Sequence, residues 1–231
     1  MNDAVAQTAR LTIAGREEYL RICGAGDGVA ILLVPPLFGE MNRCRRLLAD
    51  VMIALAGRGH GCALPDLPGT GESLTAIENV ALDDWRAMIA ESARLLHDAT
   101  GRAPLLASFR GGAVLDDAAD AAARWRMTPV EGVTTLRELA RAQRMTGTST
   151  AASTGAVFAG TPLAAMLAGP LATAVPVGPA VVVRLEDDPK AADARIAGAP
   201  LWRRAEPGRD QAMAARIAED IDRIATSCAS S

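Results

Sequence analysis

The feature that most constrains this chain is a short apolar segment ending in two glycines, Leu-Leu-Ala-Ser-Phe-Arg-Gly-Gly at positions 105–112. Its apolar residues predict a buried strand. Small residues, Ser108 and Gly112, lie two positions before and two positions after Arg110. This spacing is typical of a turn in which backbones pack closely. A helix is predicted to follow, from Gly111 to Trp125, so Arg110 occupies the apex of a sharp strand-to-helix turn.

Strand-like and helix-like segments alternate through most of the chain, which predicts an α/β protein with a mostly parallel sheet and helices on both faces. Ala9–Gly15 and Glu18–Gly24 instead alternate apolar and polar residues and predict an antiparallel hairpin at the sheet edge. The later strands are predicted at Val29–Val34, Gly61–Pro65, around Met127–Val130, at Val177–Leu185 and, weakly, at Arg195–Leu201. The other helices are predicted at Met41–Arg58, Leu82–Asp98 and Asp210–Thr226.

One segment, Glu131–Pro176, interrupts the alternation. It contains a basic amphipathic helix at Thr135–Met145, a Gly/Ser/Thr stretch at Thr146–Gly155 and an Ala/Leu segment at Pro162–Ala174. An insertion of helix and loop at this point would cover the ends of the strands. We therefore expect a single domain over residues 1–231, with residues 131–176 forming a small lid within it.

Composition narrows the classes of function. A net charge of −3 gives no reason to expect nucleic acid or an anionic membrane as a partner, and no apolar run is long enough to span a membrane. The four cysteines are scattered without metal-ligand spacing, which favours reduced thiols and indicates neither a metal site nor a cofactor. No signal peptide is visible, so a cytoplasmic location is expected. The oligomeric state stays open.

Three motifs follow one another in the order and spacing of the α/β-hydrolase fold, which the chain resembles over nearly its whole length. They are the Pro35–Glu40 loop, the Asp66-x-x-Gly69-x-Gly71-x-Ser73 loop and Ser108-Phe-Arg110-Gly-Gly112. The resemblance makes the third motif a nucleophile elbow. It also implies an oxyanion hole formed by the backbone N–H groups of Gly111 and of Leu37 or Phe38.

A narrower resemblance is to the exosortase A system-associated hydrolases of the hydrolase 2 type. Its signature is Pro35-Pro36-Leu-Phe-Gly-Glu40-Met41-Asn42-Arg43-x-Arg45-Arg46, and the segments Trp125–Val130 and Gly198–Trp202 are also similar. The family's elbow tends to begin with glycine, where this chain has Ser108. The resemblance implies a hydrolase associated with bacterial exopolysaccharide loci that carry PEP-CTERM sorting components. It also makes Trp202 a candidate ligand-binding residue.

The residues themselves do not predict a Ser-His-acid triad. Arg110 stands where the nucleophile belongs, and a guanidinium stays protonated and has no lone pair to attack with. The two histidines, His60 and His97, are predicted at the amino ends of the strands, and none follows Arg110. Ser108 is expected to pack rather than react, and Ser73 to stabilise a turn.

The candidate catalytic residues are Arg110, Glu40 and Asp187, with Asp188 as an alternative to the last. Two interpretations of Arg110 remain open. In the first, it binds a carboxylate or phosphate of a small-molecule or glycan-derived ligand at the N-terminus of the Gly111 helix, with Leu37, Phe38, Ser108, Gly111, Asp66 and Trp202 as further ligand-binding candidates. In the second, it forms an internal salt bridge with Glu40, Asp66 or Asp187. Glu40 is also a candidate cap of the helix beginning at Met41.

Three classes of function follow. The chain is a hydrolase of an exopolysaccharide- or lipid-linked acyl substrate, or a non-catalytic anion-binding protein on the hydrolase scaffold. In the third class it is an assembly protein acting through the 131–176 segment. The residues favour the second class, and the family resemblance favours the first.

Overall fold

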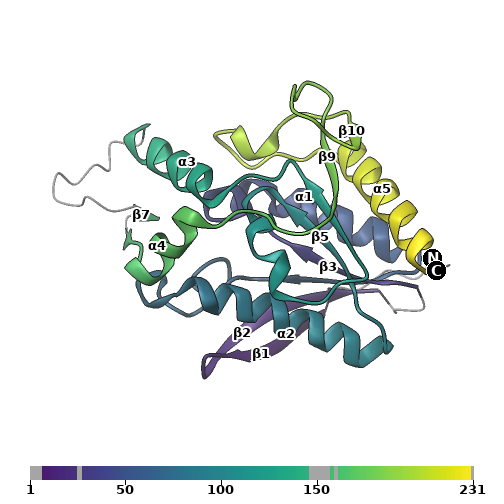
Figure 1. Ribbon diagram of the computed structural model, residues 1–231, viewed down its shortest axis with the longest axis horizontal. Coiled ribbons are helices and arrows are strands. Elements are labelled where there is room, and N and C mark those ends of the chain that lie inside the picture. Colours follow the sequence, from purple (N-terminus) through teal and green to yellow (C-terminus); the bar gives the residue numbers. More distant parts are fainter. Residues whose placement is uncertain (1–6, 25–27, 146–156, 159–160, 230–231) are drawn as a thin grey trace.

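The computed structural model describes residues 7–24, 28–145, 157–158 and 161–229. An eight-stranded sheet forms the centre of the molecule, with helices on both of its faces (Figure 1). In spatial order its strands are β1 (Gln7–Ile13), β2 (Arg16–Cys23), β4 (Gly61–Pro65), β3 (Ala30–Val34), β5 (Leu105–Phe109), β6 (Ala123–Met127), β9 (Val181–Leu185) and β10 (Ala194–Ile196). The α-helices are α1 (Gly39–Ala56), α2 (Leu82–Thr100), α3 (Gly132–Met145), α4 (Ala165–Thr173) and α5 (Gln211–Ala229).

The N-terminal hairpin is confirmed. β1 and β2 pair antiparallel from Gln7↔Ile22 to Ile13↔Arg16. The two residues that connect them, Ala14 and Gly15, both have positive φ, as the tight turns that match strand twist require.

The remaining strands run parallel from β4 to β10, which confirms the predicted sheet. Every residue of β3, β4 and β5 is buried, because helices cover both faces of the sheet and leave no polar side for these strands. This explains their continuous apolar sequences. The carboxyl ends of β3, β5 and β6 consequently meet at one edge of the sheet.

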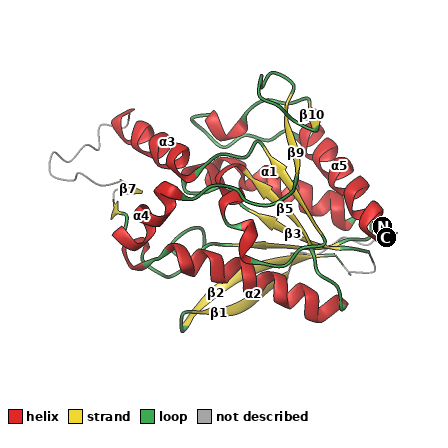
Figure 2. Ribbon diagram, viewed as in Figure 1, coloured by secondary structure: helices red, strands yellow, loops and turns green. Residues whose placement is uncertain are grey.

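Figure 2 shows the two helical layers, with α1 and α5 on one face of the sheet and α2 on the other. Polar contacts from α5 supplement its apolar packing. Asp220 accepts a 2.7 Å hydrogen bond from the indole Nε1 of Trp125 in β6, and Asp222 lies 2.8 Å from Nε2 of His60. Helix α5 is thus bound to β6 and to the residue that precedes β4.

The predicted helix Gly111–Trp125 is wrong. Two short 3₁₀ turns, Arg110–Val114 and Asp116–Ala118, follow β5, and β6 begins at Ala123, before the predicted strand. Two glycines disfavour a helix at its start. The alternation of arginine with apolar residues at positions 124–127 is a strand pattern, because Arg124 and Arg126 bind Asp116 while the residues between and after them enter the core.

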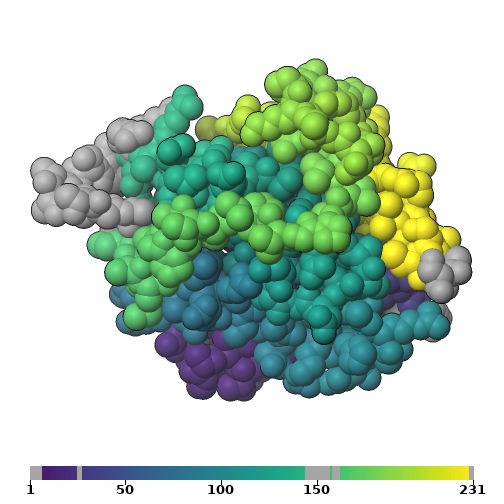
Figure 3. Space-filling view, viewed as in Figure 1, coloured from purple at the N-terminus to yellow at the C-terminus, as the bar shows by residue number. Residues whose placement is uncertain are grey.

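Residues 131–176 contribute α3, α4 and two short paired strands, β7 (Val157–Phe158) and β8 (Thr161–Pro162). Figure 1 shows α3 and α4 together at one end of the molecule, and Figure 3 shows the chain after α4 crossing the front toward β9. The predicted Gly/Ser/Thr stretch Thr146–Gly155 lies outside the described residues. Among those described, no helix is both long and apolar enough to cross a bilayer.

Candidate functional site

The backbone at Arg110 forms the sharp turn that the sequence predicts. Arg110 has φ +54°, a left-handed conformation that side chains other than glycine rarely adopt. A Cβ atom at Gly112 would lie 2.2 Å from the carbonyl oxygen of Pro35, so only glycine fits there. Ser108, the other small residue, is fully buried. The tight elbow is therefore present, with an arginine at its apex.

Backbone strain is concentrated around this elbow. Phe38, Arg110 and Thr128 have φ of +53°, +54° and +46°, and they follow β3, β5 and β6 respectively. Ala14 in the hairpin turn is the other non-glycine residue with positive φ within the described ranges. A left-handed non-glycine residue costs on the order of 1–3 kcal/mol, and such residues cluster at functional sites. The edge formed by these strand ends is therefore the candidate functional site.

The Arg110 side chain is 3% exposed and is bound by two carboxylates. Its Nε and Nη2 donate to Glu40 on α1, the shortest bond being 3.0 Å from Nη2 to Oε1. Nη2 also donates to both carboxylate oxygens of Glu138 on α3, at 3.1 and 3.0 Å. The Trp202 ring centroid lies 5.1 Å from the guanidinium carbon, a cation–π distance. The salt-bridge interpretation thus describes Arg110 here, with Glu40 as the partner that was predicted and Glu138 as one that was not.

Glu40 faces Arg110 instead of capping its own helix. Helix α1 has Phe38 at its N-cap position, and no side chain caps it. Burial raises the pKa of Glu40 to about 7, against the opposing effect of the Arg110 charge, and the nearby Glu138 carboxylate raises it further. Glu40 therefore titrates near neutral pH.

A cavity of about 510 Å³ opens beside this charge cluster, between the loop after β3, helix α3 and the 201–203 segment. Its apolar wall is formed by Leu37, Phe38, Leu139, Ala142 and Trp202. The Nε1 atom of Trp202 is buried without a hydrogen-bond partner. The volume and apolar lining are those of a small-molecule site.

Three further arginines line the cavity: Arg43, Arg141 and Arg203. Arg43 donates to the carbonyl oxygen of Trp202 at 3.2 Å. None of the three forms an ion pair with any residue of the described structure. Three guanidinium groups therefore line the cavity with the carboxylates of Glu40 and Glu138, and both carboxylates are bound to the buried Arg110. The cavity therefore carries an excess of positive charge.

The helix N-terminus predicted at Gly111 is wrong, because Gly111 begins no α-helix, so the predicted anion site lacks this support. A Cβ atom at Gly111 would meet Oγ1 of Thr135 at 2.7 Å and Leu37 at 3.2 Å. Helix α3 and the loop after β3 thus pack directly on the elbow. The five-residue 3₁₀ turn has too few aligned peptide dipoles to attract an anion as a full helix does.

Ser108 belongs to a buried structural network. Its hydroxyl donates a 2.8 Å hydrogen bond to Asp116, which is fully buried and accepts two bonds from Arg126 at 2.8 and 2.9 Å. This network connects β5 to the turn after the elbow and to β6. The contacts of Ser108 are those of the packing role.

The other predicted acids lie apart from Arg110. Asp66 lies 3.8 Å from Arg45 and accepts from the backbone N–H of Glu72, and its burial raises its pKa. Asp187 is exposed after β9, and Asp188 pairs with Arg184 at 3.0 Å.

Ser73 stabilises the loop that follows Asp66. Its hydroxyl accepts from the N–H groups of Gly69 and Thr75. These are the contacts of the turn role that the sequence indicates for it.

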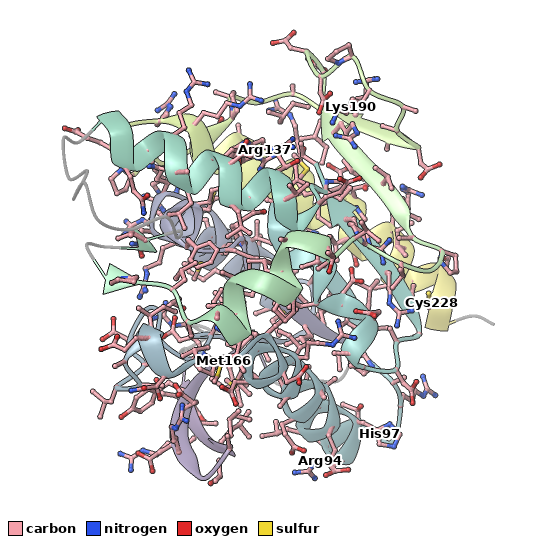
Figure 4. All side chains as sticks on the ribbon, turned by 60° about the vertical axis from the view of Figure 1, so that its left-hand side comes forward. Arg94, His97, Arg137, Met166, Lys190 and Cys228 are labelled. Atoms are coloured by element: carbon pink, nitrogen blue, oxygen red, sulfur yellow. The ribbon has the colours of Figure 1, made fainter. Side chains whose placement is uncertain are left out.

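Neither histidine contacts the elbow. His60 accepts from the N–H of Val29 at 3.2 Å through Nδ1 and faces Asp222 through Nε2. His97 is exposed near the end of α2, and Figure 4 shows it beside Arg94, well away from Arg137 on α3. Cys44 lies near Glu40, but its burial raises its thiol pKa to about 12, so it is no thiolate at neutral pH.

Glu138, Arg141 and Arg203 were not predicted from the sequence as site residues. The first two lie on α3, whose amphipathic pattern identifies a helix but does not indicate which polar residues face the elbow. No group of three or more potential metal-ligating side chains occurs within the part of the chain that the structure describes.

Comparison with solved structures identifies the fold. A thermophilic esterase from Thermogutta terrifontis, determined with malate bound, superposes with a TM-score of 0.64 at 16% identity, over 96% of this chain and 99% of that one. A protein assigned as a carboxylesterase from Lactobacillus plantarum superposes with a TM-score of 0.54 at 15% identity, over 98% of each chain. No protein-family model and no curated protein matches the sequence.

These superpositions span both chains almost end to end, so they concern the whole architecture. The narrower resemblance to exosortase-associated hydrolases receives no support from a family model. At identities near 15% the likeness is one of fold. The chain has the α/β-hydrolase fold, with its N-terminal antiparallel hairpin, its mostly parallel sheet and an arginine at the elbow apex.

Proposed function

We propose that this protein binds an anionic, partly apolar small molecule in the cavity beneath α3 and does not cleave it by serine-hydrolase chemistry. The observation that carries this proposal is the lining of the cavity. Apolar walls from Leu37, Phe38 and Trp202 adjoin three arginines without ion-pair partners in the described structure. Such walls bury an apolar group, while the guanidinium groups bind carboxylate or phosphate oxygens.

The elbow supports binding over hydrolysis. Arg110, at the apex of the elbow, is buried and bound by Glu40 and Glu138. Its guanidinium stays protonated in this setting, so it has no lone pair with which to attack a substrate. His60 is engaged by Val29 and Asp222, and no histidine adjoins the elbow to act as a general base.

A second candidate function is hydrolysis through a carboxylate. Glu40 borders the cavity, and its pKa of about 7 suits a general base at neutral pH. In this alternative Glu40 would take a proton from a water molecule that attacks an ester's acyl carbon, and would return it to the alcohol oxygen that departs as the acyl C–O bond breaks. Its bonds to Arg110 oppose this role, because they use the oxygens that would receive the proton.

Two measurements test the proposal. Isothermal titration with octanoate, octyl phosphate and the uncharged octyl glucoside should show binding of at least one anion and none of the glycoside. Arg203→Gln should weaken anion binding by roughly fivefold, the effect of losing about 1 kcal/mol from a partly exposed charge contact. The control variant Arg204→Gln changes an exposed neighbouring arginine that does not line the cavity. Absence of anion binding would contradict the proposal.

The second measurement is hydrolysis of short- and medium-chain p-nitrophenyl esters by the native protein, Arg110→Ala and Glu40→Gln. The proposal expects the native rate to equal that of buffer. A native rate well above buffer that Glu40→Gln abolishes would establish the carboxylate mechanism instead. Arg110→Ser tests the elbow geometry, since slow burst chemistry there would show that the turn can still present a nucleophile.

The biological setting is a further part of the proposal. The Pro35–Arg46 signature supports a role beside bacterial exopolysaccharide synthesis in the cytoplasm, with an anionic, glycan-derived or lipid-linked ligand as cargo. Deletion of the gene and analysis of the secreted polysaccharide test this role. The assembly alternative receives support from the exposed Met166 on α4, and mass measurement in solution tests it.

A further inference from the structure

Two carboxylates compete for Arg110, and they are not equivalent. Glu40 already satisfies Nε and Nη2 of the guanidinium from a side chain that is 11% exposed. Glu138 adds a second carboxylate to the same Nη2 atom from a side chain that is 39% exposed and borders the cavity. When Glu40 is ionised, the Glu40–Arg110 pair is neutral without Glu138, and Glu138 then adds a second negative charge that this pair does not need.

Glu138 also has an alternative partner within reach. Arg141 lies three residues later on α3, a spacing at which helix side chains meet, and it has no ion-pair partner among the described residues. A rotation of the Glu138 side chain toward Arg141 would therefore exchange one guanidinium for another. The helix itself does not have to move, and no buried charge is left unpaired.

We infer that Glu138 occupies the place of a ligand carboxylate on Arg110, and that a carboxylate-bearing ligand enters the cavity by replacing it there. This inference rests on the proposed function and specifies the ligand's headgroup. The apolar part of the ligand lies against Phe38, Leu139 and Trp202, and its carboxylate takes the two bonds that Nη2 now donates to Glu138.

Charge favours a carboxylate over a phosphate at this position. Replacing Glu138 by a carboxylate exchanges one negative charge for another beside Glu40. A phosphate dianion would add a further negative charge next to the Glu40 carboxylate, which opposes its binding. Arg43, Arg141 and Arg203, which line the rest of the cavity, can bind either anion. A preference for a carboxylate over a phosphate therefore indicates binding at Arg110.

The test is the affinity of the folded full-length protein for octanoate and octyl phosphate, measured by isothermal titration in native, Glu138→Gln and Glu131→Gln proteins. Glu131 precedes the same helix, is exposed and has no side-chain bond to Arg110 in the described structure, so its substitution makes the same change in net charge without removing a partner of the guanidinium. Removing the internal competitor should tighten octanoate binding by about tenfold, because the native site is open for only a small fraction of the time. Glu131→Gln should leave the affinity unchanged.

The outcomes separate the inference from the proposed function. If the native protein binds octanoate and Glu138→Gln binds it equally or more weakly, Glu138 is not a ligand mimic and the inference is overturned, while the binding function stands. If octyl phosphate gains as much as octanoate from Glu138→Gln, the assignment of a carboxylate is overturned. If neither anion binds to any folded variant, the proposed function fails, and the inference fails with it.

Discussion

The guanidinium of Arg110 and the carboxylate of Glu40 lie 3.0 Å apart, although seventy residues separate them in the sequence. Arg110 projects from the turn after β5, and Glu40 projects from the first turn of α1. Their pairing fixes the loop after β3 against the elbow. It also places a buried charge pair at the sharp turn that follows β5.

The Arg110–Glu40 pair predicts that substitutions of its two members have strongly non-additive effects on the free energy of unfolding. Arg110→Met, which keeps a long side chain, should lower the free energy of unfolding by roughly 3 kcal/mol because it leaves Glu40 buried without its main partner. The double variant Arg110→Met/Glu40→Met should recover most of the loss, since both charges are then gone. Urea unfolding of both single variants and the double variant checks this, and additive losses would contradict it.

Glu40 also predicts a pH dependence of stability. Its folded-state pKa of about 7 lies above its ordinary value of 4.5, so between these values the folded protein binds more protons than the unfolded chain. The contribution of Glu40 to the free energy of unfolding is therefore fully present below pH 4.5, and it decreases by up to about 3 kcal/mol as the pH rises to 7 and above. Glu40→Gln should flatten this part of the profile, measured by urea unfolding at several pH values. A native profile with the same slope as the variant would show that Glu40 does not titrate in this range.

The buried network of Ser108, Asp116 and Arg126 predicts that Asp116 contributes more to the stability of the protein than its neighbour Asp117 does. Asp116→Asn should destabilise the protein by about 3 kcal/mol, because Asp116 is fully buried between Ser108 and Arg126. Asp117 pairs with Arg86 near the surface, so Asp117→Asn should cost only about 1 kcal/mol or less. Thermal and urea unfolding compare the two. Equal losses would mean that the network contributes nothing beyond a surface pair.

The close contact at the elbow predicts a severe glycine effect. Gly112→Ala would place a Cβ atom 2.2 Å from the carbonyl oxygen of Pro35, so it should cost at least ~3 kcal/mol or prevent folding. Gly169 on α4 is exposed with open space around its Cβ position. Gly169→Ala should therefore change the free energy of unfolding by only about 0.5 kcal/mol, because the Pro170 ring that follows it opposes the gain in helix propensity. Soluble yield and urea unfolding report on both variants.

The sequence predicted the fold well where local pattern and packing agree. The buried strands, the hairpin and the helices α1, α2 and α5 lie within a few residues of their predicted positions, because their apolar spacing reflects the faces that they bury. The segment after Arg110 was predicted as a helix because the alternating arginines of β6 were not recognised as partners of Asp116. That interaction joins two elements, and no local pattern encodes it.

The candidate site was predicted only in part, for a similar reason. Arg110, Glu40, Leu37 and Phe38 come together, as expected of segments that follow neighbouring strand ends. Trp202, a candidate through the family resemblance alone, lies beside them. Glu138 was not identified, because its role depends on how α3 rotates about its own axis when it packs on Gly111. The helical pattern of α3 identifies its apolar face. It does not indicate that Glu138, among the polar residues of this helix, reaches Arg110.

The attachment of α5 has a consequence for synthesis of the chain on the ribosome. Met213, Ile217 and Ile221 of this last helix cover a sheet face that includes Trp125 and Val183, and its aspartates complete the contacts of Trp125 and His60. These partners are all translated long before residues 211–229. The apolar face of the sheet that α5 covers is therefore exposed in the nascent chain until residues 211–229 have emerged, and the chain is prone to aggregation during this interval.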